Sequence, residues 1–188
     1  MKRILLGSNS PRRKELLTQM GYDFDIVKIE CDEDFDNSLE ISEVAEFLAN
    51  EKSEAYGQLG EDDSLVTADT TVLANHKILN KPSNRKDAVE MLKSLSGRIH
   101  HVSTGVCLRT SNRLVSLNEV TEVEVAKLSI QEISEYVDSF KPYDKAGAYG
   151  IQEWFGLRYV KEIRGCYFNV VGLPTSKVHK HLKELLNV

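Results

Sequence analysis

The feature of the sequence that most restricts its fold is the alternation of strand-like and helix-like segments along the whole chain. The first example is the apolar run Ile4-Leu5-Leu6, which predicts a short buried strand. Ser10 then offers a helix N-cap and Pro11 suits the first helical position, so a tight turn and a helix are expected directly after this strand. No repeat or low-complexity linker interrupts the alternation. The sequence therefore predicts a mixed α/β fold.

Strand and helix signals recur along the rest of the chain. Apolar spacing and capping residues predict helices that begin at Ser42, cover 88–95, follow the capping box Ser129-Ile130-Gln131-Glu132, and come after Pro174. Strands are predicted at 65–68 (ending at Asp69), at 102–108, at 120–125 and as two short segments around Arg164-Gly165, with a hairpin about Asn75-His76. Residues 141–152 are rich in glycine and charge without either period, which predicts an ordered loop that could close over a ligand.

Length and charge limit the domain organisation and the partners. The chain has 188 residues, with 24 Lys plus Arg against 29 Asp plus Glu, which gives a formal net charge of −5. This length suits one domain or two small lobes of one fold, and we expect a single domain over residues 1–188. The acidic balance excludes a protein held on nucleic acid by bulk charge, so any positive charge that binds an anion must be local.

The cysteines and the lack of an export signal indicate a reduced, cytoplasmic protein. Cys31, Cys107 and Cys166 cannot all pair with one another, and none lies in a C-x-x-C spacing. The apolar run after Lys2 and Arg3 is too short for a signal peptide, and no apolar stretch approaches the length of a membrane span. No membrane partner is expected.

The predicted first helix carries an unusual charge at its start. Arg12, Arg13 and Lys14 place three cations where the helix dipole is already positive and where acidic residues are normally preferred. An absent anion would account for this arrangement, because two guanidiniums, the amides of the first turn and the hydroxyls of Ser8 and Ser10 together suit a phosphate group. The alternative is a solvated basic turn whose arginine stems lie on the surface.

Asp69 is a second candidate for chemistry. Ligands of α/β sheets gather at the carboxyl ends of strands, so a carboxylate there could be a metal ligand or a base, and the alternative is an Asp that caps the next turn. Carboxylates of the acidic segment 23–36 could join it around Mg²⁺, although a solvated acidic stretch accounts for most of them. Lys52 and Lys81 matter only if the fold brings them to the same place, and otherwise are surface lysines.

The sequence lacks the motifs of several common enzyme classes. It has no G-x-x-x-x-G-K-[ST] phosphate loop, no G-x-G-x-x-G fingerprint, no H-E-x-x-H and no G-x-S-x-G. The five histidines do not form a convincing metal set and are predicted to be surface or strand residues.

Six segments taken together resemble one known family. They are residues 8–17, 68–72, 81–82, 103–106, 144–152 and 169–174, whose order and spacing resemble the Maf family of nucleoside triphosphate pyrophosphatases. The resemblance implies a fold like that of inosine triphosphate pyrophosphatases, with a curved mixed sheet, flanking helices and two lobes around a nucleotide cleft. It also implies cleavage of a nucleoside triphosphate to a monophosphate and pyrophosphate with a divalent metal, Mg²⁺ or Mn²⁺, and it is compatible with a homodimer.

The resemblance also assigns roles to single residues. Asp69 matches the family's proposed catalytic base, and Lys52 and Lys81 fall on positions linked to catalysis. A metal would be held by Asp69 and Glu33. The substrate-binding positions implied by the resemblance are Ser8, Ser10, Arg12, Arg13, Thr70, Asp144, Lys145 and Gln152.

Three of these positions resemble the branch of the family that acts on dTTP and UTP. They are Arg12, Thr70 and Gln152, where the sister branch acting on 7-methyl-GTP typically has Trp, Gln and Glu. An amide such as Gln152 could read the polar edge that thymine and uracil share. The chain departs from the family pattern at Gly7, Cys166 and Glu153, and the last of these adds a negative charge beside the predicted base-reading loop.

Two alternatives remain open from the sequence. One is a nucleotide-binding regulator of septum formation that keeps the cleft without turnover, since this family has been linked to septum formation. The other is a pyrophosphatase that prefers modified nucleotides and cleans the nucleotide pool. Both would use the same phosphate-binding residues.

Overall fold

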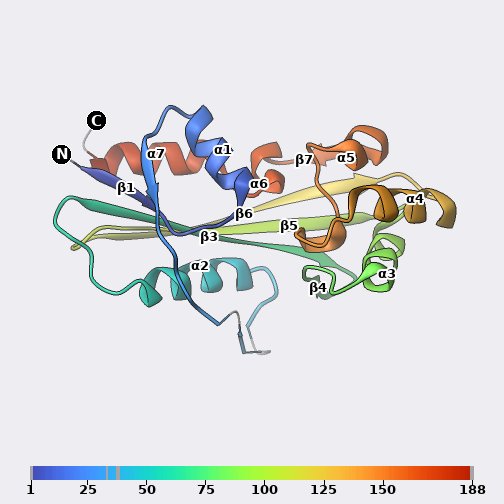
Figure 1. The fold of residues 1–188 in the computed structure, drawn as a ribbon, viewed down its shortest axis with the longest axis horizontal. Helices are drawn as coiled ribbons and strands as arrows, with labels where there is room; N and C mark the ends of the chain where they lie inside the picture. The colour runs from blue at the N-terminus through green and yellow to red at the C-terminus, as the bar shows by residue number, and fades with distance from the viewer. Residues whose placement is uncertain (1, 33, 37–38, 187–188) are drawn as a thin grey trace. The chain divides into compact units, whose positions relative to one another are not determined.

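A seven-stranded mixed sheet organises the protein, seen in a computed structural model that describes residues 2–32, 34–36 and 39–186 (Figure 1). Its strands are β1 (Arg3–Leu6), β2 (Phe24–Ile26), β3 (Asp63–Ala74), β4 (Lys77–Leu79), β5 (Ile99–Arg109), β6 (Leu114–Val125) and β7 (Val160–Arg164). The strand order is β2-β1-β3-β5-β6-β7, and β4 pairs with β3. Strand β1 is parallel to β2 and β3, whereas the β3–β4 and β6–β7 pairs are antiparallel.

Helices lie between the strands and after the last strand along the chain. They are α1 (Pro11–Gln19), α2 (Val44–Ala55), α3 (Arg85–Leu95), α4 (Ile130–Phe140), the 3₁₀ helix η1 (Ala146–Ala148), α5 (Trp154–Tyr159), α6 (Tyr167–Val171) and α7 (Thr175–Leu186). The predicted α/β class, a mixed sheet with flanking helices, is confirmed. None of the helices in the described ranges has both the length and the apolar character that crossing a membrane requires.

The chain divides into two compact units, each built from separate stretches of sequence. Unit 1 comprises Met1–Asp69, Thr104–Glu119 and Gly172–Val188, and unit 2 comprises Thr70–Ser103 and Val120–Val171. Strands β3, β5 and β6 each contribute residues to both units.

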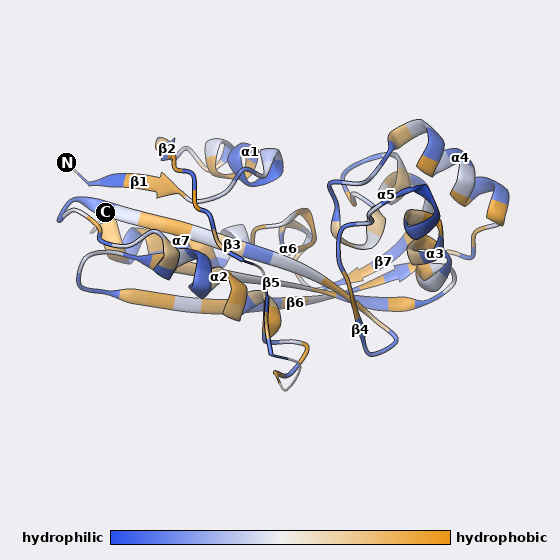
Figure 2. Ribbon diagram, turned by 60° about the horizontal axis from the view of Figure 1, so that its bottom comes forward, coloured by the Kyte–Doolittle hydropathy of each residue, from blue (hydrophilic) through white to orange (hydrophobic). Residues whose placement is uncertain are grey.

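In unit 1, helices cover both faces of the strands. Helix α2 lies on one side of the strands, and α1 and α7 lie on the other (Figure 1). Buried aliphatic side chains fill the space between the layers, among them Leu5, Leu17, Leu48, Leu65 and Leu182. Figure 2 shows these apolar segments on β1 and β3, as expected for strands that are buried on both faces.

Helix α2 approaches the sheet closely because β5 carries a glycine under it. A Cβ atom built on Gly105 would lie 2.2 Å from the backbone nitrogen of Glu46 and 2.3 Å from the carbonyl of Ala45. Only a residue without a side chain allows this contact between the first turn of the helix and the strand.

In unit 2, aromatic side chains form much of the core. Tyr136 of α4 is fully buried and stacks with Trp154, and Phe155 and Tyr159 of α5 pack edge-on against each other. His100 of β5 is buried and lies 2.7 Å from the hydroxyl of Tyr149 through its Nε2 atom. Helix α4 is amphipathic, and Figure 2 shows its mixture of polar and apolar residues.

Several local predictions are confirmed. Ser10 caps α1 with Pro11 at the first helical position, and Ser129 and Glu132 form the predicted capping box of α4. The hairpin between β3 and β4 turns at Asn75 and His76, which have φ angles of 51° and 58°.

Three local predictions are wrong. Strand β3 does not end at Asp69 but continues to Ala74, because its second half pairs with β4. Only β7 forms near Arg164-Gly165, and the segments on either side of it are the short helices α5 and α6. Helix α2 begins at Val44, after three turn residues, and not at Ser42.

Candidate functional site

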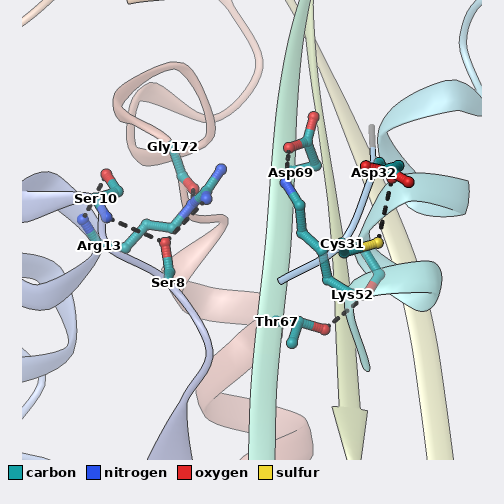
Figure 3. Close-up of polar contacts among 10 residues, drawn as sticks. Ser8, Ser10, Arg13, Cys31, Asp32, Lys52, Thr67, Asp69 and Gly172 are labelled. Atoms are coloured by element: carbon teal, nitrogen blue, oxygen red, sulfur yellow. Dashed lines mark hydrogen bonds and ion pairs between the residues drawn. The ribbon is translucent and has the colours of Figure 1, made fainter. Parts of the chain in front are cut away.

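The turn between β1 and α1 gathers hydroxyl and guanidinium groups, and we call residues 8–13 the serine–arginine turn. The Ser8 hydroxyl oxygen accepts hydrogen bonds from the Ser10 backbone N–H and from Nη1 of Arg13, both at 3.2 Å. Nε of Arg13 also donates to the carbonyl of Gly172 at 2.9 Å, and the Ser10 hydroxyl accepts from the Arg13 backbone N–H (Figure 3). The Arg13 side chain is therefore held by the Ser8 hydroxyl and the Gly172 carbonyl, and its backbone by the Ser10 hydroxyl.

The serine–arginine turn carries the positive charge that the sequence predicts for the start of α1. Helix α1 has no acidic residue in its first turn, and Arg12, Arg13 and Lys14 are all half-buried. The structure thus brings Ser8, Ser10, Arg12 and Arg13 together at a helix N-terminus, where amide groups and positive charge favour an anion.

A second polar contact joins α2 to β3. Nζ of Lys52 lies 2.5 Å from Oδ1 of Asp69, and each side chain is only 15% exposed. Because both groups are largely removed from water, this charged hydrogen bond is stronger than a surface ion pair. It holds the Asp69 carboxylate at a defined position on β3.

The serine–arginine turn follows β1 and Asp69 lies on β3, and these neighbouring strands of unit 1 are parallel. The backbone N–H of Gly7 donates to the carbonyl of Val66 at 2.9 Å, so the carboxyl end of β1 lies beside the part of β3 that leads to Asp69. Figure 3 shows the serine–arginine turn and the Lys52–Asp69 pair together, with the Arg13 guanidinium on the side of its turn that faces β3 in this view. The serine–arginine turn and a carboxylate–ammonium pair thus belong to one unit.

The residues available for a metal are few. Glu33 lies outside the described residues, and within the described ranges no group of three or more His, Cys, Asp or Glu side chains could hold a metal ion. Asp69 offers one carboxylate, whose Oδ1 atom already contacts Lys52. Such a donor set fits Mg²⁺ or Mn²⁺ carried largely by substrate phosphates and water, and does not fit a metal held in a cage of protein ligands.

Unit 2 contains a third polar group in the loop after α4. Nζ of Lys145 lies 2.8 Å from Oδ1 of Asp144 and 3.4 Å from Oε1 of Glu153, and the lysine side chain is 12% exposed. The sequence singles out Glu153 but does not predict that it pairs with Lys145. The backbone N–H of Gly147 donates to the carbonyl of Asn80 at 3.3 Å, which places this loop beside the residue that precedes Lys81.

Three further predicted site residues lie on β3 and in two loops. Thr70 is half-buried on β3, whereas Lys81 and Gln152 are exposed in loops of unit 2. The structure thus resolves the predicted site into the serine–arginine turn, the Lys52–Asp69 pair, the Asp144–Lys145 pair and these three residues.

The largest pKa shifts occur in the core and not among the predicted site residues. Burial, with a smaller effect of the nearby His101, lowers the pKa of His100 to about 4. Burial also raises the pKa of the Cys107 thiol, a fully buried side chain on β5. Both side chains are therefore neutral near pH 7, and neither suits acid–base or nucleophilic chemistry.

A cavity of about 290 Å³ lies at another place in unit 1. Its walls are Lys2, Glu184, Leu185 and the segments 61–64 and 110–113. None of the predicted site residues lines it.

Comparison with known proteins identifies a family that this chain matches. A family model described as Maf-like protein matches residues 3–185. A curated relative from Bacteroides fragilis named dTTP/UTP pyrophosphatase is 48% identical over 185 residues, which cover 97% of this chain and 96% of the relative. A relative of the same name from Flavobacterium johnsoniae is 44% identical over 185 residues, which cover 98% of this chain and 95% of the relative.

Solved structures give a weaker likeness. A HAM1 protein from Coxiella burnetii matches 68% of this chain and 75% of its own chain, with a TM-score of 0.44 and 12% identity. This likeness is too weak to support an inference about function.

Proposed function

This chain belongs to the Maf-like protein family, and on that basis we propose that it is a nucleoside triphosphate pyrophosphatase that hydrolyses dTTP and UTP to dTMP and UMP. The family resemblance predicted from the sequence is thereby confirmed. One observation carries the proposal: relatives named dTTP/UTP pyrophosphatase are 44% to 48% identical to this chain over nearly its whole length. The serine–arginine turn and the Lys52–Asp69 pair supply groups that this reaction needs.

Substrate phosphates bind at the serine–arginine turn. Arg12 and Arg13 offer guanidinium groups that hold phosphate oxygens in pairs, and the first-turn amides of α1 add uncharged donors. The family resemblance adds Lys81 to the catalytic residues and Lys145 to those that bind the substrate. Most of the catalysis of phosphate transfer comes from such positioning and charge stabilisation.

In the proposed reaction, Asp69 acts on the attacking water. In the reaction, the water oxygen bonds to the α-phosphorus, the bond from that phosphorus to the bridging oxygen breaks, and pyrophosphate leaves. Asp69 accepts the proton that the water loses. Lys52, 2.5 Å from this carboxylate, fixes its orientation and stabilises the negative charge that builds on the phosphates.

A divalent metal is part of the proposal. Asp69, with Glu33 and the substrate phosphates, would hold Mg²⁺ or Mn²⁺, which supplies charge stabilisation at the α-phosphate and a more acidic water. The proposal also includes a cytoplasmic location and is compatible with a homodimer.

The choice of base is assigned to Arg12, Thr70 and Gln152. Thymine and uracil share the edge formed by O2, N3–H and O4 and differ by one methyl group. A site that reads this edge through an amide accepts both bases and rejects purines by size.

A panel of nucleotides tests this function. We would incubate the protein with natural and modified triphosphates and Mg²⁺ or Mn²⁺, and measure pyrophosphate separately from orthophosphate. We expect pyrophosphate from dTTP and UTP, with ATP and GTP turned over more slowly. Faster turnover of modified nucleotides would redirect the proposal to pool cleaning, and binding without any product would favour the non-catalytic regulator.

The role of Asp69 has its own prediction. Asp69→Asn keeps the size of the side chain but cannot accept the proton, so we expect turnover of dTTP to fall at least about 100-fold. Asp63→Asn on the same strand removes one carboxylate that pairs with Arg3, and we expect it to remain active. Pyrophosphate release by Asp69→Asn near the wild-type rate would exclude Asp69 as the base.

A further inference from the structure

Among the polar contacts that join helix α2, which carries Lys52, to the sheet, two are made by side chains that have no role in the reaction described above. The first is Thr67 of β3, which is fully buried. Its hydroxyl donates a hydrogen bond to the carbonyl of Ala49 at 2.7 Å (Figure 3). This bond links the middle of α2 to the strand that also carries Asp69.

The second is Arg109, at the end of β5. Its Nε atom donates to the hydroxyl of Ser53 at 2.9 Å, and its Nη2 atom donates to the carbonyls of Ser53 and of Gly57, the latter at 2.9 Å. The last carbonyls of a helix have no partner within the helix, and a positive charge at that end is favourable. Arg109 therefore caps the C-terminal end of α2.

These contacts lie on both sides of Lys52. Ala49 precedes it by three residues and Ser53 follows it directly, so both belong to the same part of the helix. Thr67 and Asp69 are two residues apart on β3 and so project from the same face of the strand. The position of the helix over β3 determines where the base of the long, flexible lysine side chain lies, and thus whether Nζ reaches Asp69.

We propose that Thr67 and Arg109 are positioning residues that hold Lys52 against Asp69. They act by fixing the rotation and height of α2 over the sheet and do not touch the substrate. This inference rests on the proposed function, because it assigns these residues to the same reaction. It assigns a role in catalysis to a buried threonine and to an arginine that would otherwise be regarded as structural residues only.

Substitution of Thr67 is the direct test. Thr67→Val removes the hydroxyl with little change of shape, and we expect kcat for dTTP to fall about 10-fold while KM stays within about twofold, because a small misplacement of a catalytic group mainly affects the transition state. Thr67→Ser keeps the hydroxyl and should restore most of kcat. Ser64→Ala is the matched control, since Ser64 is a buried residue of the same strand whose hydroxyl makes no hydrogen bond.

Arg109 is half-buried and not a core residue, so it provides a second position for substitution. Arg109→Lys keeps the charge but cannot contact Ser53 and Gly57 together, so we expect a loss of kcat about as large as that in Thr67→Val. This variant keeps the proposal testable if Thr67→Val does not fold.

A double-mutant cycle separates positioning from general destabilisation. In a Lys52→Ala background, Thr67→Val and Arg109→Lys should cause no further loss of the residual turnover, because the group that they position is gone. Losses that multiply with that of Lys52→Ala, or a kcat of Thr67→Val equal to that of wild type, would overturn the proposal.

A measurement that does not depend on turnover tests the positioning role independently of the proposed function. The NMR signal of the Lys52 ammonium group, assigned by its absence in Lys52→Arg, reports the contact with Asp69. We expect it to shift and broaden in Thr67→Val and Arg109→Lys and to remain unchanged in Ser64→Ala. An unchanged signal in both variants overturns the positioning role, whereas a wild-type protein that releases no pyrophosphate overturns the proposed function alone.

Discussion

At the scale of single residues, the environment of Lys145 decides how strongly it attracts a phosphate. Two carboxylates, those of Asp144 and Glu153, lie within 3.4 Å of its ammonium group. The Glu153 side chain also covers Gly150, where an added Cβ would lie 2.8 Å from the glutamate carboxyl carbon. The charge of Lys145 is therefore largely offset, and a polyanionic substrate that binds there, as proposed, would compete with Glu153 for it.

Removing that carboxylate should strengthen substrate binding. We expect Glu153→Gln to lower KM for dTTP about threefold at low ionic strength, and less at high salt, because screening weakens the lost repulsion. Glu162→Gln, which removes an exposed carboxylate paired with Arg164 on β7, is the control and should leave KM unchanged. An increase of KM in Glu153→Gln would instead mean that Glu153 orients Lys145 for binding.

The sequence alone predicts only part of the site. The wrong sign of charge at the start of α1 identifies Arg12 and Arg13 without any family knowledge, because a local rule is broken there. The resemblance assigns Lys52 and Asp69 to one site, but their pairing is not predicted, because it joins residues 17 positions apart through tertiary packing. Thr67 could not be found, since a threonine in an apolar strand gives no signal of its hydrogen bond to Ala49.

At the scale of elements, β5 and α2 pack closely against each other at Gly105. Gly105→Ala would place a methyl group against the backbone of α2, which cannot move without displacing the helix. We expect a loss of about 1–3 kcal/mol in the free energy of unfolding, measured by chemical denaturation.

Gly7→Ala is the matched comparison. A Cβ at Gly7 would meet Cδ1 of Ile29 at 2.4 Å and Cγ2 of Thr67 at 2.9 Å, so its closest contact is the flexible end of a side chain. We expect this variant to lose less stability than Gly105→Ala. Equal losses in the two variants would show that the backbone of α2 adjusts as easily as a side chain.

Elements with signals in their own sequence were predicted better than those that depend on tertiary packing. The capped helices α1 and α4 carry their start signals in sequence, and apolar residues identify β5 and the second half of β6, although β6 begins at Leu114 and not at residue 120. Helices α5 and α6 have six and five residues, too short to be stable by themselves, so packing of side chains such as Phe155 determines them. Strand β3 extends past Asp69 because of its pairing with β4, which a local pattern does not reveal.

At the scale of the whole molecule, a buried histidine makes stability depend on pH. His100 has a pKa of about 4 in the folded protein, below its ordinary value of 6.5. Between these two values the unfolded chain binds more protons than the folded protein, so stability falls as pH falls from 6.5 to 4. The full shift corresponds to about 3 kcal/mol of unfolding free energy.

Replacing the histidine should remove this dependence. We expect His100→Gln to lose less of its unfolding free energy than wild type between pH 7 and pH 4.5, as measured by denaturation at both values. His101→Gln, at an exposed neighbouring position, should keep most of the wild-type dependence, because burial is the main cause of the lowered pKa of His100. Parallel losses in wild type and His100→Gln would assign the acid sensitivity to other groups.

The division of the chain into two units has a consequence for any attempt to separate them. The backbone passes from one unit to the other at 69/70, 103/104, 119/120 and 171/172. No single cut therefore releases either unit, and no continuous stretch of the gene encodes unit 1 or unit 2 by itself. Halves obtained by limited proteolysis or truncation would each hold incomplete portions of both, so the two are expected to be produced, and to unfold, only as one polypeptide.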